Sequence, residues 1–410
     1  MENASAGTLR LPTRVHFGYG SRAQLGEVLR LGGRRVLAVA DPFLTETPIF
    51  TETVARLRDD GLDVAVYRDI RPELPVESLD AGEAFAREYR PDVVLAVGGG
   101  SALDAAKLIG LLATYGGPLS RYYGENKVPG PTLPLVAVPT TAGTGSEVTP
   151  VAVVSDPDHE MKVGVSSPYL IPSAAVVDPE FTLGAPRGVT AFAGIDALVH
   201  AVESFTAARL DPPWDATLPV FTGTNAFTDT IALRAAEHLG SWLRVAVDEP
   251  GNRRARQEVA LGSLLAGISF GATGTHLSHA LQYPIGALTK TPHGLGTGLL
   301  LPYVLQACLA DAAAAERIAA VGAALGSTAA GGEERARDAI RAIAALNRAI
   351  GVPATLKEIG ITEDQLPRIA ELGSRATRLV AIAPIPAPTE TLLDILEHAY
   401  AGHLLERSDP

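Results

Sequence analysis

The feature that most constrains the fold is a series of short apolar runs in the first half of the chain. Each run has four to six residues, is rich in Val or Ala, and is bounded by Gly, Pro or Asp. Several of the segments between them have apolar residues at helical spacing. The runs comprise residues 35–40, 63–67, 92–97, 135–138 and 174–177. This alternation predicts an α/β domain with a Rossmann-like parallel sheet whose strands are joined by crossover helices.

The second half of the chain has a different pattern. After about residue 187, long Ala- and Leu-rich segments dominate and no further strand is predicted. These segments comprise residues 191–207, 229–247, 253–268, 309–326 and 333–350. A chain of 410 residues is long enough for two domains. We therefore expect an α/β domain over residues 1–187 and an all-helical domain over residues 188–410.

Composition narrows the classes of function. The chain has 34 basic and 46 acidic residues, a net charge of −12, so a nucleic-acid partner is not expected. It contains no apolar stretch of about 20 residues, and its start lacks the apolar core of a signal peptide. Cys308 is the single cysteine, which excludes an intrachain disulfide. We expect a cytoplasmic protein, without membrane contact, that acts on a small molecule.

Two glycine-rich segments follow predicted strands. Residues 98–101 (Gly-Gly-Gly-Ser) lie between a strand and a helix, where free backbone N–H groups suit a diphosphate. For this segment alone, a tight turn without a ligand is the less favoured alternative. Residues 139–149 form a second such segment, rich in Thr, Ser and Gly. Two such loops at successive strand ends predict an extended nucleotide lying across the sheet edge.

Asp41 directly follows the predicted strand 35–40. A carboxylate there can accept hydrogen bonds from ribose hydroxyls and repels a 2′-phosphate. Its presence favours NAD over NADP, although an Asp-Pro pair after a strand is also a common turn.

The helical half contains a candidate metal site. Asp196 and His200 are four residues apart, which puts both side chains on one face of a helix. His276, His279 and His293 lie within 18 residues, in a chain that has nine histidines. A satisfied pair in the core is the alternative reading of Asp196 and His200 alone. One carboxylate with two or three imidazoles suits Fe(II) or Zn(II).

In these motifs the chain resembles the iron-dependent, or group III, alcohol dehydrogenases. The resemblance rests on residues 98–107, 139–149, 194–200 and 279–293, in the order and separation of that family. It implies an N-terminal dinucleotide-binding domain, a helical metal-binding domain, and a substrate held with the metal between the two. It also implies a homodimer or larger homo-oligomer.

The resemblance further implies roles for individual residues. The implied metal ligands are Asp196, His200, His279 and His293, with Fe(II) as the first choice and Zn(II) as the second. Phe270 would line the substrate pocket. The residues implied to bind NAD are Asp41, Gly98, Gly99, Gly100, Ser101, Asp104, Thr140, Thr141, Ser146, Thr149 and Lys162.

One position departs from the family pattern. Tyr283 stands where many members carry a His near the nicotinamide, so proton handling or substrate preference is expected to differ. The surrounding residues 276–285 resemble the hydroxyacid–oxoacid transhydrogenase branch, although the chain lacks the insertion of that branch.

The resulting hypothesis is an enzyme that interconverts an alcohol and its aldehyde or ketone. A divalent ion would polarise the substrate oxygen while a hydride moves between carbon and NAD. The alternatives are a hydroxyacid–oxoacid transhydrogenase or 4-hydroxybutyrate dehydrogenase, a lyase resembling dehydroquinate synthase, and a non-catalytic nucleotide-binding protein.

Overall fold

The structure is a computed structural model that describes residues 7–405. The described residues divide into two compact units. The first unit comprises residues 10–185, and the second comprises residues 186–405 together with residues 7–9.

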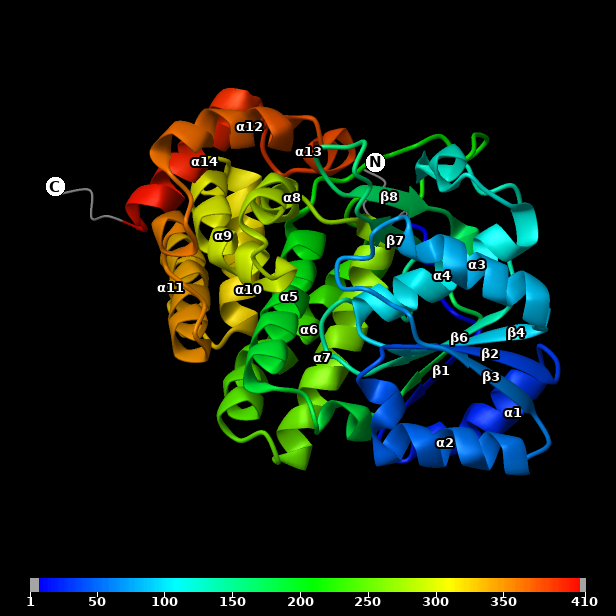
Figure 1. Ribbon diagram of the computed structural model, residues 1–410. Helices are drawn as coiled ribbons and strands as arrows, with labels where there is room; N and C mark the ends of the chain where they lie inside the picture. Colours follow the sequence, from blue (N-terminus) through cyan, green and yellow to red (C-terminus); the bar gives the residue numbers. More distant parts are fainter. Residues whose placement is uncertain (1–6, 406–410) are drawn as a thin grey trace, which may run out of the picture. The chain divides into compact units, whose positions relative to one another are not determined.

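The first unit contains a six-stranded parallel sheet in the order β1-β9-β6-β4-β2-β3 (Figure 1). Its strands are β1 (Arg14–Phe17), β2 (Arg35–Ala40), β3 (Asp63–Tyr67), β4 (Val93–Gly98), β6 (Leu135–Pro139) and β9 (Ala174–Val177). All except β1 were predicted as apolar runs. Strand β1 was missed because its sequence, Arg-Val-His-Phe, is short and half polar, as suits the exposed edge of a sheet.

Helices cover both faces of this sheet (Figure 1). They are α1 (Leu25–Arg30), α2 (Pro48–Asp59), α3 (Ser78–Tyr89) and α4 (Gly100–Tyr115). Side chains alternate along β2: Leu37 and Val39 join the core beneath α3 and α4. Val36 and Ala38 join the core beneath α1 and α2. A strand with both faces buried reads as a continuous apolar run, which is why the sequence revealed it.

The first unit also holds a small sheet in the order β5-β8-β7 that was not predicted. Its strands are β5 (Gly124–Glu125), β7 (Val151–Val154) and β8 (Val163–Ser166). Short 3-10 helices complete both units: η1 (Ser21–Gln24), η2 (Leu44–Glu46), η3 (Leu119–Tyr122), η4 (Pro168–Leu170), η5 (Pro179–Thr182), η6 (Leu356–Ile359) and η7 (Glu363–Gln365).

The second unit is helical, as predicted. Among the described residues, its β-structure is limited to one isolated β-bridge between Arg209 and Gly223. Its helices are α5 (Arg187–Thr206), α6 (Ala226–Asp248), α7 (Arg253–Thr273), α8 (Leu277–Thr289), α9 (His293–Cys308), α10 (Ala312–Ala324), α11 (Gly332–Ile350), α12 (Leu366–Ser374), α13 (Thr377–Ala381) and α14 (Thr389–Ala401). Helices α8 and α9 were not predicted because each contains an internal proline, Pro284 and Pro302 respectively.

Helix α5 is the buried centre of the second unit. It packs against α6, α7 and α9, and every residue from 194 to 206 is buried. A helix that is apolar on all sides belongs in a core, so the few charged side chains on it need partners.

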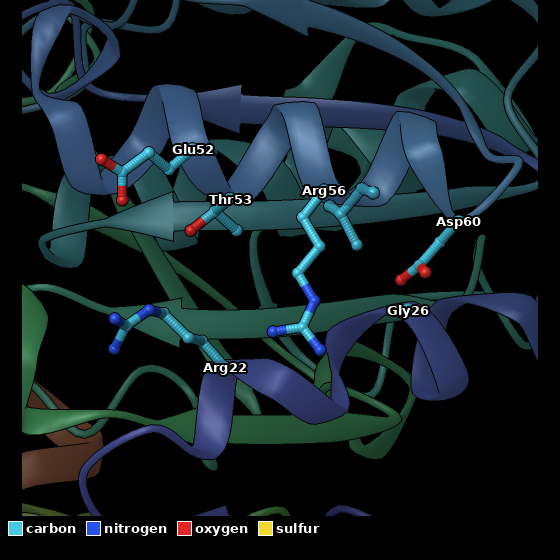
Figure 2. Close-up of a pocket in the computed structure, with 7 residues that line it drawn as sticks. Arg22, Gly26, Glu52, Thr53, Arg56 and Asp60 are labelled. Atoms are coloured by element: carbon cyan, nitrogen blue, oxygen red, sulfur yellow. The ribbon is translucent and has the colours of Figure 1, made fainter.

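No helix in the described part of the chain is long and apolar enough to cross a membrane. A pocket of about 160 Å³ lies beside α2 in the first unit, where Arg22 and Arg56 are accompanied by Glu52 and Asp60 (Figure 2). This volume is below the several hundred Å³ of a typical cofactor site, and the charges in the pocket balance.

Candidate metal centre and nucleotide-binding loops

One face of α5 carries three ionisable side chains. Asp196, His200 and Glu203 follow one another at intervals of four and three residues, so they lie in a row along the helix. Their exposed fractions are 3%, 5% and 0%. The structure therefore buries a set of polar groups on a helix whose other buried residues are mostly apolar.

Helices α8 and α9 bring two further histidines to Asp196. The Nε2 atoms of His279 and His293 each lie 3.9 Å from Oδ1 of Asp196. Nε2 of His200 lies 3.8 Å from Oδ2 of the same carboxylate. One ligand atom each from Asp196, His279 and His293 lie within 4.8 Å of one another. The structure thus brings together all four residues implied as metal ligands.

The close approach of α9 to α5 depends on a glycine. A Cβ atom at Gly294 would lie 2.0 Å from the carbonyl oxygen of Phe192 and 2.8 Å from Cβ of Asp196. No side chain fits there, so Gly294 allows the start of α9, with His293, to reach Asp196. One turn further along, Thr297 donates its hydroxyl to Oδ1 of Asp196 at 2.8 Å and fixes that carboxylate.

The cluster has the chemistry of a divalent-metal site. Nε2 of His279 is buried and makes no hydrogen bond, while its Nδ1 lies 2.7 Å from Oε2 of Glu203. Atoms bound about 2.1 Å from one ion are separated from each other by about 3–4 Å. The Nε2 atoms of His279 and His293 lie at such a distance from Oδ1 of Asp196. An unused imidazole nitrogen beside a carboxylate therefore fits a metal ion bound by nitrogen and oxygen.

The electrostatics of Asp196 agree with this fit. Burial alone would raise its pKa, but the adjacent histidines His200, His293 and His279 and the Thr297 hydroxyl lower the pKa below its ordinary value. Asp196 is therefore held as a carboxylate, the form that can bind a cation.

The geometry also distinguishes His276 from His279. The backbone N–H of Leu277 donates to Nδ1 of His276, and Nε2 of His276 lies 2.9 Å from Oγ1 of Thr206. That hydroxyl already donates to the carbonyl of Val202, so it accepts from Nε2–H of His276. Both ring nitrogens of His276 are thus in use, whereas His279 keeps one available.

Two aromatic residues border the histidines. Phe270 is stacked on His200 with ring centroids 4.2 Å apart, and it is 7% exposed. The Tyr283 ring lies nearly parallel to that of His293 at 6.0 Å. Phe270 and Tyr283 therefore each pack against a candidate metal ligand.

In the first unit, the structure brings Asp41 to the first glycine loop. The backbone N–H of Gly99 donates to Oδ2 of Asp41 at 3.0 Å. The loop meets the second glycine-rich segment, since a Cβ atom at Gly100 would lie 2.7 Å from Cγ2 of Thr144. Thr140 donates its N–H to the carbonyl of Gly98. Glycine at position 100 lets the two loops pack at the start of α4, which begins at that residue.

Three residues implied to bind NAD are bonded to other parts of the first unit. Oγ of Ser146 donates to Oδ1 of Asp104 at 2.6 Å, and the other carboxylate oxygen of Asp104 accepts from the N–H of Val153. The carbonyl of Thr149 accepts from Nζ of Lys107 at 2.9 Å. Lys107 and Asp104 on α4 therefore hold the segment 146–153 in place.

Lys162 lies directly before β8 and forms an ion pair with Glu73, and its charge also acts on the buried carboxylate of Asp104. Ser101 and Thr141 lie beside Gly100 and Gly99, in the first turn of α4 and the facing loop. The structure thus places the eleven residues implied to bind NAD in three settings: the loop edge, the interior of the unit, and the small sheet.

Burial shifts the pKa values of the charged groups behind the loops. It lowers the pKa of Lys107 to about 8, against the attraction of Asp104 and Glu147. It raises the pKa of Glu147 to about 7, against the attraction of Lys107. When Glu147 is protonated, the charged groups left among these three residues are the ammonium of Lys107 and the carboxylate of Asp104.

Sequence reasoning missed Glu203 and Glu147. Glu203 could have been noticed because it lies seven residues after Asp196 on the same helix face. Its partners lie 73 to 76 residues away, and no local pattern in the sequence indicates them.

Two family models match the chain. The model described as iron-containing alcohol dehydrogenase matches residues 12–179, and the model described as the C-terminal part of the Fe-containing alcohol dehydrogenase family matches residues 190–400. Together they cover both units.

Individual proteins agree with this assignment. Long-chain-alcohol dehydrogenase 1 of Geobacillus thermodenitrificans is 35% identical over 98% of this chain and 99% of that protein. The mitochondrial hydroxyacid-oxoacid transhydrogenase of Caenorhabditis elegans is 32% identical over 93% of this chain and 88% of that protein. The structure of sulfoacetaldehyde reductase from Bifidobacterium kashiwanohense in complex with NAD+ superposes with a TM-score of 0.81, at 27% identity, over 96% of this chain and 98% of that one. The chain therefore belongs to the iron-containing alcohol dehydrogenase family.

Proposed function

We propose that this protein is an NAD-dependent, iron(II)-dependent alcohol dehydrogenase that interconverts an alcohol and its aldehyde or ketone. The observation that carries the proposal is the convergence of Asp196, His279 and His293, with Nε2 of His279 buried and unpartnered. The family match favours this reaction over the lyase and over a non-catalytic nucleotide-binding protein.

The second unit would hold the iron through Asp196, His200, His279 and His293. A divalent ion bound there supplies Lewis acidity at the alcohol oxygen. Thr297 keeps the Asp196 carboxylate oriented, and Phe270 covers one face of the His200 ring and excludes water from it. Family membership supports Fe(II), and the comparisons give no support for Zn(II).

The first unit would bind NAD at the glycine loops. Free N–H groups at the start of α4 can donate to the diphosphate, and glycines at 98–100 let it approach the backbone. Asp41 would accept hydrogen bonds from the ribose hydroxyls and repel the 2′-phosphate of NADP. Bound NAD supplies the hydride acceptor.

The substrate is an alcohol whose further structure varies within the family. The relatives named above are a long-chain-alcohol dehydrogenase, a hydroxyacid-oxoacid transhydrogenase and a sulfoacetaldehyde reductase. Tyr283, beside His293, would contact the substrate and can donate or accept a proton through its phenol. The transhydrogenase is the second candidate function, because such a relative aligns with 93% of this chain.

The test compares His279→Ala with His238→Ala. His238 belongs to the same unit but pairs with Glu258 and contacts none of the proposed ligands. We expect His279→Ala to lose bound iron and to lower kcat/KM by more than about 100-fold, because the loss of even an outer partner of a metal ligand costs 10–100-fold. His238→Ala should keep both. Full iron content and activity in His279→Ala would overturn the site.

The same preparations test the cofactor and the second candidate function. Formation of NADH from a panel of primary alcohols and hydroxy acids is followed by absorbance, with NAD and NADP compared. We expect a preference for NAD. If the chain is a transhydrogenase, turnover of a hydroxy acid will instead require an added 2-oxo acid and will release no free NADH.

A further inference from the structure

We propose that Glu203 is a positioning residue that fixes the orientation and the protonated nitrogen of His279, so that Nε2 of His279 is presented to the metal ion. This inference rests on the proposed function, because it assumes that the cluster around Asp196 binds a metal. It adds to the candidate site a residue, Glu203, that is not itself one of the candidate metal ligands.

The first support is the set of contacts that Glu203 makes. Its side chain has no exposure, and it accepts hydrogen bonds from the backbone N–H of His276 at 2.9 Å and of Ser278 at 2.6 Å. Its Oε2 atom lies 2.7 Å from Nδ1 of His279. One carboxylate on α5 therefore holds three groups at the start of α8, from residues 276, 278 and 279.

The second support is the placement of the imidazole proton. A neutral imidazole carries a single N–H, and an ionised carboxylate can only accept. Both carboxylate oxygens of Glu203 already accept backbone N–H groups, Oε2 that of His276 and Oε1 that of Ser278, so the side chain is used as an acceptor at each oxygen. The proton of His279 must then lie on Nδ1, which leaves a lone pair on Nε2, the atom 3.9 Å from Asp196.

The third support is charge. The ionisable side chains next to the Glu203 carboxylate within the described residues are His276 and His279, and no Lys or Arg pairs with it. If the histidines are neutral, Asp196 and Glu203 leave two negative charges in the core of the unit. A divalent cation would neutralise both, which makes Glu203 favourable to metal binding at a distance as well as through His279.

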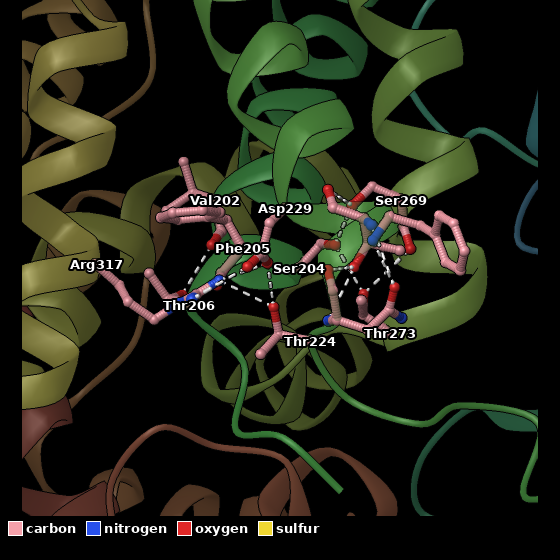
Figure 3. Close-up of polar contacts among 12 residues, drawn as sticks. Val202, Ser204, Phe205, Thr206, Thr224, Asp229, Ser269, Thr273 and Arg317 are labelled. Atoms are coloured by element: carbon pink, nitrogen blue, oxygen red, sulfur yellow. Dashed lines mark hydrogen bonds and ion pairs between the residues drawn. The ribbon is translucent and has the colours of Figure 1, made fainter. Parts of the chain in front are cut away.

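The fourth support is the rigidity of the helix end that carries Glu203. Arg317 donates to the carbonyl of Phe205 and pairs with Asp229, as Figure 3 shows. On the other side, Thr273 donates to Ser204, which also bonds to Ser269. Residues 204–206 are thus tied to α6, α7 and α10, so Glu203 is a fixed point from which α8 is aligned.

The test measures metal affinity rather than activity. Metal-free protein is titrated anaerobically with Fe(II) and with Co(II), using a competing chelator, and the Co(II) absorption spectrum reports the ligand geometry. In Glu203→Gln, an amide NH₂ next to His279 would force its proton onto Nε2. The opposite amide orientation would set two donors, the NH₂ and the N–H of Ser278, against each other. We expect an affinity loss of about 10–100-fold and an altered Co(II) spectrum.

Two variants separate positioning from folding. Glu203→Asp keeps a carboxylate that is one methylene shorter, so we expect it to recover part of the affinity, and it serves as the test if Glu203→Gln does not fold. Asp229→Asn breaks the pair with Arg317 at the same end of α5 without touching a proposed ligand. It should lower Tm but keep metal affinity within about 3-fold of the unmodified protein.

The outcomes distinguish the inference from the proposed function. If the unmodified protein binds no metal, the proposed function fails and the inference fails with it. If it binds metal and His279→Ala does not, while both Glu203 variants bind as tightly as the unmodified protein, the positioning role alone is wrong.

Discussion

The two units use buried charged side chains in the same way but with a different balance of charge. In the first unit, Asp104 and Lys107 on α4 hold the segment 146–153 behind the glycine loops. In the second, Glu203 on α5 holds residues 276–278 and His279. The first set pairs an ammonium with carboxylates, whereas the second has carboxylates and histidines only. The first is therefore balanced by the chain itself, and the second would become balanced on binding the proposed cation.

Replacing Lys107, the buried positive charge of the first unit, should have the largest effect on stability. Lys107→Met leaves Asp104 without its nearest positive charge and two carbonyls, those of Thr149 and Val151, without their donor. Removing a buried charge whose counter-charge stays buried costs about 3–5 kcal/mol in the free energy of unfolding. Chemical denaturation measures the change. Lys127→Met, the same substitution at an exposed position, should change it by less than about 0.5 kcal/mol. Equal stability of the two variants would contradict the role given to Lys107.

Removing the metal should affect the second unit and spare the first. At an ion concentration 1,000 times Kd, binding stabilises the folded chain by about 4 kcal/mol, so chelation should lower Tm. Hydrogen exchange then locates the change: amides at the start of α8 should exchange faster in the metal-free protein, while those of α4 should not. An equal increase in the exchange rate of α4 amides would contradict the proposal that only the second unit depends on a bound cation.

The pH dependence of the free energy of unfolding should depend on Glu147 in the first unit. We expect this effect to be smaller than the two above. Because the pKa of Glu147 is raised to about 7, the folded chain keeps a proton that the unfolded chain loses near pH 4.5. The free energy of unfolding should therefore fall as pH rises from about 4.5 to 7, by about 2–3 kcal/mol. In Glu147→Gln this slope should be absent. The slope is measured by denaturation of metal-free protein at a series of pH values, and an unchanged slope in the variant would assign it to other groups.

Much of the fold could be predicted because burial leaves a periodic trace in the sequence. Strands β2, β4, β6 and β9 are buried runs, and β3 is a partly buried one. Helix α5 has the spacing that puts Asp196 and His200 on one face. Helices α8 and α9, which carry His279 and His293, were not predicted because each contains an internal proline. The sequence therefore indicated the histidine cluster but not the two helices that position it.

The partners of the buried charges could not be predicted. Ser146 and Asp104 were both expected at the cofactor, yet they bond to each other across 42 residues. Hydroxyls and carboxylates look the same in a sequence whether they contact a ligand or the chain. The same holds for Glu203, whose importance depends on segments that only tertiary packing brings to it.

Gly294 has a consequence for engineering this protein toward other alcohols. Since a Cβ atom there would lie 2.0 Å from the Phe192 carbonyl, no L-amino acid can replace the glycine without separating α9 from α5. A mutagenesis library that randomised the residues around His293 would lose every member altered at 294. Directed evolution of substrate range is better begun at Tyr283, where a side chain is already present and can be exchanged while the backbone stays in place.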